Sequence, residues 1–241
     1  MAEQRGGAPN AGEAGQGGRG RGAPDAAGEV ACAWDELVAT ARRTVADGLV
    51  VGTSGNVSVR VGDIVLVTPT GVPYERLEPD DAVGVDLDGR QLLGTLRPTS
   101  ELPMHLAVYR TTTARAVVHT HAVHATAVST LVPELPLVHY MAAALGGAVR
   151  VAPYATYGTA ELAENMLRAL TDRTACLLQN HGTIAHGSSL TQAYDRTAQL
   201  EWMCRLWLTA SSVPGLSPTL LTPEQVSEVA ERLRGYGQGR A

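Results

Sequence analysis

The chain has 241 residues and a formal net charge of −5 at pH 7, with 44% hydrophobic and 18% charged residues. All 19 basic residues are Arg, because the sequence contains no Lys, and Phe is absent as well. A Schiff-base aldolase, a pyridoxal phosphate enzyme and a P-loop nucleotide site each depend on a lysine amine, so these three chemistries are excluded. The mild acidity also argues against nonspecific nucleic-acid binding, which needs a clustered positive surface.

The first part of the chain has an unusual composition. Residues 1–29 are rich in Gly and contain no Val, Ile, Leu, Trp or Tyr. Such a segment cannot bury enough apolar surface to offset the entropy of ordering. We therefore predict a disordered low-complexity tail over 1–29 and a single domain over 30–241.

The lack of long apolar segments and of paired cysteines indicates where the protein is found and whether its thiols are reduced. No apolar run approaches the roughly 20 residues that would span a bilayer, and the N-terminus lacks the apolar stretch of a signal peptide. We expect a cytoplasmic protein that binds no membrane. Cys32, Cys176 and Cys204 are far apart and odd in number, so we expect buried reduced thiols rather than disulfides.

The first half of the domain predicts one helix followed by strands. From Trp34 to Val45 apolar residues recur at helical spacing, and Gly48 follows them, which indicates an amphipathic opening helix. Residues 57–61 and 64–67 flank a Gly-Asp turn and predict a hairpin. A further strand is predicted at 83–87, before an Asp-Gly turn, so that all of these strands precede the second helix.

The second half alternates between helices and strands. Residues 101–112 and 190–210 predict helices, and 116–121 and 175–179 predict strands. A last helix is predicted to begin after Thr222, with Pro223 at its first position and Gln225 completing a capping box. This order predicts an α/β fold, a three-layer α/β/α arrangement with a central mixed, mostly antiparallel sheet.

Two histidines lie two residues apart in the predicted strand at 116–121. His119 and His121 would project to the same face, because side chains alternate along a strand. Two adjacent imidazoles can hold one Zn²⁺, which takes nitrogen ligands at about 2.0 to 2.1 Å and needs at least one further ligand. A pair of half-buried polar residues explains an isolated His-Thr-His equally well.

Further candidate ligands lie elsewhere in the chain. His181 follows a predicted strand and precedes a glycine, so its loop can face a cleft. Three histidines with one open position are typical of a catalytic zinc site. Glu101 is a candidate for a fourth, movable ligand. His124 and His186 are each five residues from a proposed ligand and would point the opposite way on a strand, so we interpret them as structural.

Short loops rich in Gly, Thr and Ser supply a second candidate feature. Residues 52–56, 70–71 and 99–100 offer backbone N–H groups and small hydroxyls. Such loops can bind a phosphate without lysine, although the same composition also makes ordinary turns. The patterns G-x-S-x-G and H-E-x-x-H are absent, which disfavours a hydrolase and a metalloprotease. No G-x-G-x-x-G follows a predicted strand, which disfavours a dinucleotide-dependent dehydrogenase.

Eight segments in this order resemble the class II zinc aldolases, and among them the members that act on L-fuculose 1-phosphate. The resemblance runs from about Trp34 to Tyr236, with Asn180 standing where a histidine is common. The matching segments are 52–60 (GTSGNVSVR), 68–74 (TPTGVPY), 99–101 (TSE), 117–124 (VVHTHAVH), 139–141 (HYM), 152–159 (APYATYGT), 180–182 (NHG) and 236–237 (YG).

The resemblance implies roles for individual residues. His119, His121 and His181 would hold one zinc ion per subunit, with Glu101 as the fourth ligand at rest and the acid/base during turnover. Tyr140 and Tyr236 match tyrosines that act in catalysis at the mouth of the site, where a homotetramer brings neighbouring subunits together. The positions that match phosphate-binding residues are Thr53, Asn56, Thr70, Gly71, Thr99 and Ser100.

The reaction that the resemblance implies is the reversible aldol cleavage of a ketose 1-phosphate, with L-fuculose 1-phosphate favoured. Its products would be dihydroxyacetone phosphate and an aldehyde, L-lactaldehyde. Without a lysine to form an iminium, zinc is expected to serve as the Lewis acid toward the substrate carbonyl.

Other proteins of the same scaffold are alternatives. A 4-epimerase of ribulose phosphate places Asp where Glu101 stands, whereas a methylthioribulose 1-phosphate dehydratase keeps zinc and glutamate. An aldolase for 5-deoxypentulose phosphates would differ mainly in the aldehyde pocket. An adducin-like interaction domain would be non-enzymatic and is expected to have lost the metal ligands, all of which are intact here.

Overall fold

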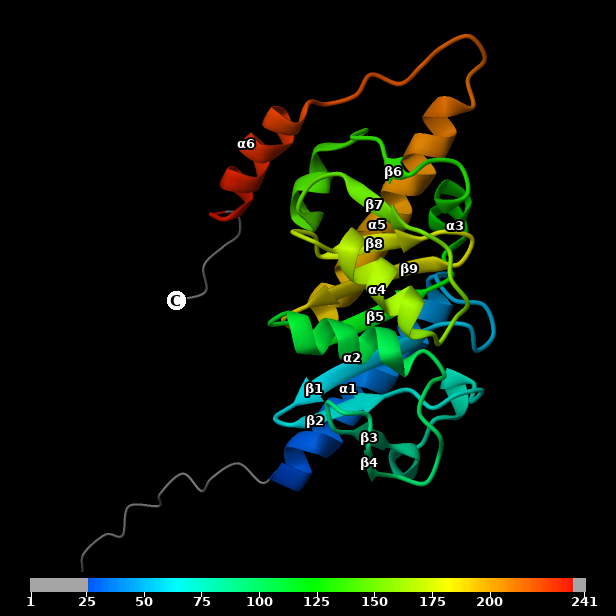
Figure 1. The fold of residues 1–241 in the computed structure, drawn as a ribbon, viewed down its shortest axis with the longest axis vertical. Coiled ribbons are helices and arrows are strands. Elements are labelled where there is room, and N and C mark those ends of the chain that lie inside the picture. Colours follow the sequence, from blue (N-terminus) through cyan, green and yellow to red (C-terminus); the bar gives the residue numbers. More distant parts are fainter. Residues whose placement is uncertain (1–25, 236–241) are drawn as a thin grey trace, which may run out of the picture.

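The computed structural model describes residues 26–235 and is built around one nine-stranded sheet (Figure 1). The strand order is β4-β3-β2-β1-β5-β9-β8-β7-β6. Among these strands the β7–β8 pair is parallel and the other neighbouring pairs are antiparallel. The strands are β1 (Asn56–Val61), β2 (Ile64–Val67), β3 (Val83–Val85), β4 (Gln91–Leu93), β5 (Ala116–Thr120), β6 (Glu134–Leu135), β7 (Val149–Ala152), β8 (Ala175–Leu178) and β9 (Gly182–Gly187).

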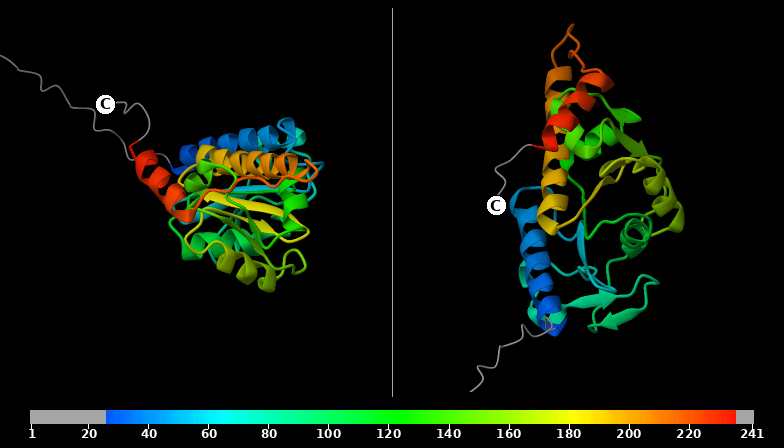
Figure 2. Two further views of the ribbon diagram at one scale, coloured as in Figure 1. Left: turned by 90° about the horizontal axis from the view of Figure 1, so that it is seen from above. Right: turned by 90° about the vertical axis from the view of Figure 1, so that its left-hand side faces the viewer.

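Helices cover both faces of the sheet (Figure 2). One face carries α1 (Ala26–Ala46), α3 (Val123–Ser129) and α5 (Leu190–Ser211), and the other carries α2 (Leu102–Thr111) and α4 (Ala160–Ala169). The predicted three-layer α/β/α arrangement with a mixed, mostly antiparallel sheet is therefore confirmed. The remaining helical segments are η1 (Tyr74–Arg76), η2 (Pro79–Asp81), η3 (Tyr140–Leu145) and α6 (Pro223–Leu233).

Every predicted helix and strand is present, and the structure also contains elements that were not predicted. Thr222 and Gln225 form the capping box of α6 as expected. The predicted ranges did not include helices α3 and α4 or strands β4, β6, β7 and β9. No helix within residues 26–235 has the length and apolar character that crossing a membrane requires.

Two expectations about the N-terminal region need correction. Helix α1 begins at Ala26, so residues 26–29 are helical rather than part of the predicted disordered tail. The rest of that tail, residues 1–25, lies outside the described residues. Cys176 and Cys204 are buried free thiols as expected, but Cys32 is exposed, because the outward face of α1 carries it.

The central strand β5 sorts its side chains between the two layers. Ala116 and Val118 pack beneath α1, whereas Val117 packs with the residues of α2 and α4. His119 follows Val117 onto the α2 side, because side chains alternate along a strand. In the β1–β5 register Asn56 lies directly opposite His119, so both side chains share that face.

We expect Gly182→Ala to destabilise the fold at the start of β9. A β-carbon at this position would lie 2.2 Å from the carbonyl oxygen of Thr120 and 3.1 Å from Cδ2 of His121. Strands β5 and β9 would have to separate, and overpacking of this kind lowers the free energy of unfolding by about 1–3 kcal/mol. Denaturant unfolding of the metal-free protein measures the loss.

Gly235→Ala is the matched control, because its β-carbon would meet nothing closer than the carbonyl oxygen of Arg232 at 4.0 Å. Equal unfolding free energies for the two variants would contradict the predicted clash.

Candidate metal centre and substrate pocket

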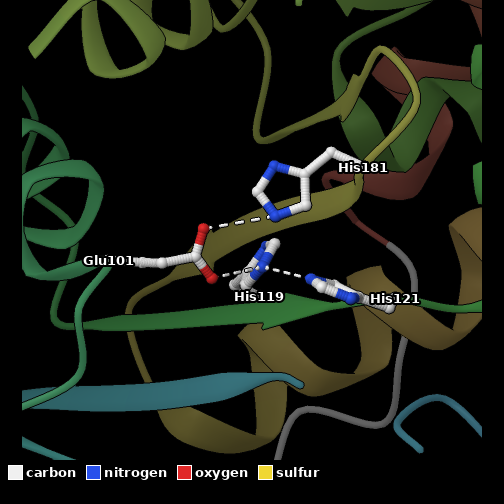
Figure 3. Close-up of side chains that lie close together, drawn as sticks. All are labelled: Glu101, His119, His121 and His181. Carbon is white, nitrogen blue, oxygen red and sulfur yellow. Dashed lines mark hydrogen bonds and ion pairs between the residues drawn. The ribbon is translucent and has the colours of Figure 1, made fainter. Parts of the chain in front are cut away.

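Four side chains from three parts of the chain converge at one end of β5 (Figure 3). His119 lies in β5, and His121 follows directly after the strand. His181 lies in the turn between β8 and β9, and Glu101 is the N-cap residue of α2. One ligand atom from each residue lies within 4.8 Å of the others. The cluster unites the ligands that the sequence predicted.

The turn that carries His181 is tight. Asn180 adopts a left-handed backbone conformation with φ of 56°, which asparagine tolerates better than most residues. The backbone N–H of His181 donates to the carbonyl oxygen of Leu178 at 3.1 Å and closes the turn. An asparagine thus suits the backbone of this position.

The three imidazole rings lie edge to face with one another. Each pair of ring centroids is 4.9 Å apart, and the interplanar angles are 72° to 79°. Nε2 of His119 and Nε2 of His121 are 3.0 Å apart. The three rings therefore enclose a common point, as ligands of one ion do.

Hydrogen bonding fixes which nitrogen of His119 is free. Its Nδ1 lies 2.7 Å from the carbonyl oxygen of Thr183, which can only accept, so Nδ1 carries the hydrogen. In the neutral ring, Nε2 then presents a lone pair to Oε2 of Glu101 at 2.9 Å. Two lone pairs facing each other at this distance need a cation between them, either a proton or a metal ion.

Glu101 is a buried carboxylate. Burial by itself raises the pKa of its carboxyl group, but the charges and hydrogen bonds of His119 and His181 outweigh burial and hold the pKa well below its usual range. Oε1 lies 3.2 Å from Nε2 of His181, yet this buried oxygen has no well-formed hydrogen bond. Because buried polar atoms are normally satisfied, a metal ion bound by the cluster would complete the coordination of Oε1.

The protonation state of the third imidazole also suits a metal. Burial, together with the charges of His119 and His181, lowers the pKa of His121 to about 4. The ring is therefore neutral at pH 7 and offers its lone pair. Three imidazole nitrogens and one carboxylate oxygen form a donor set that suits a divalent ion of intermediate softness.

A cavity of about 350 Å³ opens beside the cluster. Glu101, His121 and His181 contribute to its wall. Its volume falls in the range of sites for small ligands. The cavity brings together every residue predicted for phosphate binding: Thr53, Asn56, Thr70, Gly71, Thr99 and Ser100.

Backbone contacts tie the polar loops of the cavity to one another. The hydroxyl of Tyr74 donates to the carbonyl oxygen of Gly55 and anchors the loop at 52–56. A β-carbon on Gly55 would lie 2.8 Å from the carbonyl oxygen of His119, so glycine lets this loop lie against β5. The backbone N–H groups of Thr70 and Thr99 donate to the carbonyl oxygens of Arg97 and Thr68, each at 3.1 Å.

Some wall residues were not predicted. Ser54, Tyr154, Tyr157 and Asn180 line the same cavity, and the two tyrosines are 58% and 65% exposed. All four lie within segments that resemble the family, and this resemblance was the signal in the sequence that could have identified them as wall residues. The amide of Asn56 also donates to Oε2 of Glu101 at 3.0 Å, a contact that the predicted phosphate role did not anticipate.

Other candidates lie away from the cluster. Tyr140 is 49% exposed, stacks on His139 and is not part of the cavity wall formed by the described residues. Tyr236 lies outside the described residues. His124 is on helix α3 rather than a strand, and its Nδ1 lies 2.6 Å from the Glu201 carboxylate.

His186 also has a structural contact. Its Nε2 lies 3.3 Å from the carbonyl oxygen of Arg173. Like His124, it is not part of the metal-ligand cluster among residues 26–235.

Comparison with known proteins places this site in a family. The profile of the Class II Aldolase and Adducin N-terminal domain matches residues 35–208. The L-fuculose phosphate aldolase of Escherichia coli is 45% identical over 192 residues, which cover 79% of this chain and 88% of that enzyme. The 5-deoxy-D-ribulose 1-phosphate aldolase of Bacillus thuringiensis serovar kurstaki is 37% identical over 207 residues, 85% of this chain and 96% of that one.

The fold agrees with the sequence similarity. A solved structure of an L-fuculose 1-phosphate aldolase has a TM-score of 0.81 and 34% identity, and the match covers 84% of this chain and 96% of the other. The matched part contains the whole Glu101 and histidine cluster. The chain therefore belongs to the class II aldolase and adducin family, and it is a metal-dependent aldolase, a lyase of carbon–carbon bonds.

Proposed function

We propose that this aldolase reversibly cleaves a ketose 1-phosphate to dihydroxyacetone phosphate and an aldehyde. L-fuculose 1-phosphate is the favoured substrate and L-lactaldehyde the favoured aldehyde. The observation that carries the proposal is the position of the metal-ligand cluster in the wall of a cavity whose other loops are rich in hydroxyls. The 45% identity to an L-fuculose phosphate aldolase supports the choice of sugar.

The phosphate of the substrate would bind among the polar loops of the cavity wall. Thr53, Thr70 and Ser100 offer hydroxyls there, and Gly71 leaves room for the backbone to approach. Ser100 also directly precedes the N-cap of α2, where the helix dipole favours an anion. No Arg is part of the cavity wall formed by residues 26–235, so neutral donors of this chain would carry most of the phosphate contact.

Zinc is the metal that we propose, with one ion per chain held by His119, His121, His181 and Glu101. The fit rests on three imidazoles around one point and a buried carboxylate oxygen without a donor. A bound zinc ion would supply Lewis-acid polarisation of the substrate carbonyl.

Proton transfer falls to side chains of this chain. In the condensation direction the Glu101 carboxylate would remove a proton from the hydroxymethyl carbon of dihydroxyacetone phosphate. The electron pair left on that carbon then forms the new bond to the aldehyde carbon. A tyrosine hydroxyl would donate its proton to the aldehyde oxygen as that bond forms.

We assign the tyrosine role to Tyr140, with Tyr236 closing the site. Tyr140 is exposed and lies outside the cavity wall of its own chain, which agrees with its reaching the site of a neighbouring subunit in a homotetramer.

A 5-deoxypentulose 1-phosphate is the second candidate substrate. The relative named for 5-deoxy-D-ribulose 1-phosphate is 37% identical and is covered over 96% of its length. Both candidates would yield dihydroxyacetone phosphate, so only the aldehyde distinguishes them. An epimerase, a dehydratase or an adducin-like domain would not release this product.

The decisive assay follows dihydroxyacetone phosphate release from a panel of ketose 1-phosphates, with and without a chelator. We expect metal-dependent cleavage with preference for L-fuculose 1-phosphate. Glu101→Gln should lower kcat by about 100-fold or more, because proton transfer is lost, while the histidines still bind zinc. Near-normal turnover by this variant, or full turnover after complete metal removal, would contradict the mechanism.

The metal assignment predicts a difference between two histidine variants. Wild-type protein should bind one zinc ion per chain, and His121→Ala should weaken zinc binding by more than the roughly 10- to 100-fold typical of losing an outer-shell partner. His124→Ala is the control, because its ring contacts Glu201 rather than the cluster. Competition with a chromophoric chelator measures both affinities, and equal losses would show that the cluster is misassigned.

The phosphate assignment predicts an effect of Ser100→Ala on substrate binding. A hydrogen bond to a charged group contributes about 1.5–3 kcal/mol, so KM for the ketose 1-phosphate should rise by about tenfold or more. Ser188→Ala, an exposed serine that hydrogen-bonds to Gln192 outside the cavity, should leave KM unchanged. Steady-state kinetics would refute the assignment if Ser100→Ala matched this control.

A further inference from the structure

A line of buried polar side chains leads from Glu101 into the protein interior. Asn56, Ser58, His105 and Tyr109 are all nearly or fully inaccessible to solvent. They lie between β1 and α2, on the sheet face that also carries His119. The proposed mechanism uses Glu101 but assigns nothing to the residues behind it.

Hydrogen bonds connect these side chains without a break. The amide nitrogen of Asn56 lies 3.0 Å from Oε2 of Glu101, and its Oδ1 lies 2.5 Å from Nε2 of His105. Nδ1 of His105 lies 2.7 Å from the hydroxyl of Ser58. That hydroxyl lies 2.7 Å from the hydroxyl of Tyr109.

The chemistry of each group fixes the direction of every bond. A carboxylate oxygen only accepts, so the amide nitrogen of Asn56 donates to Glu101 and its Oδ1 must accept from His105. Burial lowers the pKa of His105 to about 3, so the ring is neutral and its other nitrogen accepts from Ser58. The hydroxyl of Ser58 in turn accepts from Tyr109.

Helix and strand geometry explain why side chains of α2 and β1 can alternate along one hydrogen-bonded line. Glu101, His105 and Tyr109 are four residues apart, which is a rise of about 6 Å along a helix. Asn56 and Ser58 are two residues apart, which is about 6.6 Å along a strand. The two repeats nearly match, so side chains of α2 and β1 interleave in the order Glu101, Asn56, His105, Ser58, Tyr109.

We propose that His105 is a positioning residue for the aldolase reaction: by donating to Asn56 it holds the amide with its nitrogen toward Glu101. This inference rests on the proposed function. A reversed amide would place Oδ1 against the carboxylate and repel it. His105 thereby keeps the Glu101 carboxylate oriented toward the histidine cluster, and it touches neither substrate nor metal itself.

The test compares His105→Phe with His105→Gln. Phenylalanine removes the donor, whereas the glutamine side chain keeps an N–H that can reach Asn56. We expect His105→Phe to lower zinc affinity and kcat by about 10- to 100-fold each, the usual effect of losing an outer-shell partner, with KM changed less than about threefold. For His105→Gln we expect zinc affinity and kcat to stay within about threefold of their wild-type values.

Thr197→Val is the matched control for removal of a buried polar group. Thr197 is fully buried, and its hydroxyl donates to the carbonyl oxygen of Ala193 at 3.0 Å, within α5 and away from the line. Its substitution should reduce thermal stability without changing zinc affinity or kcat. If His105→Phe behaves in the same way, the residue is merely structural and the proposal is overturned.

Two further measurements keep the outcome decisive. If His105→Phe does not fold, Ser58→Ala replaces it, because loss of that hydroxyl frees the tautomer of His105, and unchanged zinc affinity and kcat would overturn the proposal. Zinc affinity is measured without substrate. It therefore tests the positioning role even if wild-type protein cleaves no ketose 1-phosphate, an outcome that would overturn the proposed function alone.

Discussion

Repulsion between electron-rich atoms is the constraint on which the rest of this structure depends. Three imidazoles and a carboxylate point ligand atoms at one another within 4.8 Å, in a largely buried site. Such a group is stable only with a cation at its centre or protons between its members. The surrounding structure holds these atoms together, and an ion bound among them would be placed to act on a substrate carbonyl in the adjoining cavity.

The central part of the sheet provides the rigidity that this arrangement needs. Strand β5 lies between β1 and β9, so the segment carrying His119 is hydrogen-bonded on both edges. His181 enters from the turn that leads into β9, and Glu101 enters from the start of α2, which packs on the same face. Metal ligands on elements fixed in this way move little relative to one another.

The same packing links the metal-ligand cluster to the loops proposed to bind phosphate. Asn56 begins β1, lines the cavity and contacts Glu101, so its amide connects the loop at 52–56 to the proposed acid/base. His105 holds that amide from behind. The proposed substrate site, metal site and acid/base thus share one short stretch of β1 and one face of α2.

The sequence by itself determined much of this protein. Side-chain alternation placed His119 and His121 on one face, the capping box located α6, and the order of elements predicted a mixed sheet between helices. The absence of lysine excluded an iminium mechanism. Residue types and spacing also offered Glu101, His181 and three polar loops as candidates, and the family resemblance assigned a role to each of them. Residues from all of them line one cavity. These features are local or are carried by short motifs, so they can be read along the chain.

Only the tertiary structure decided which distant residues touch. Helix α4 and strands β7 and β9 were not predicted from the sequence. For α4 two signals were present, the N-cap residue Thr159 and apolar residues at helical spacing. The contact of Asn56 with Glu101 depends on the register of β1 with β5 and on the seating of α2. The four-residue spacing of Glu101, His105 and Tyr109 was visible in the sequence, but its partner strand was not. Pairing across the sheet is set by packing, and packing is a property of the whole fold.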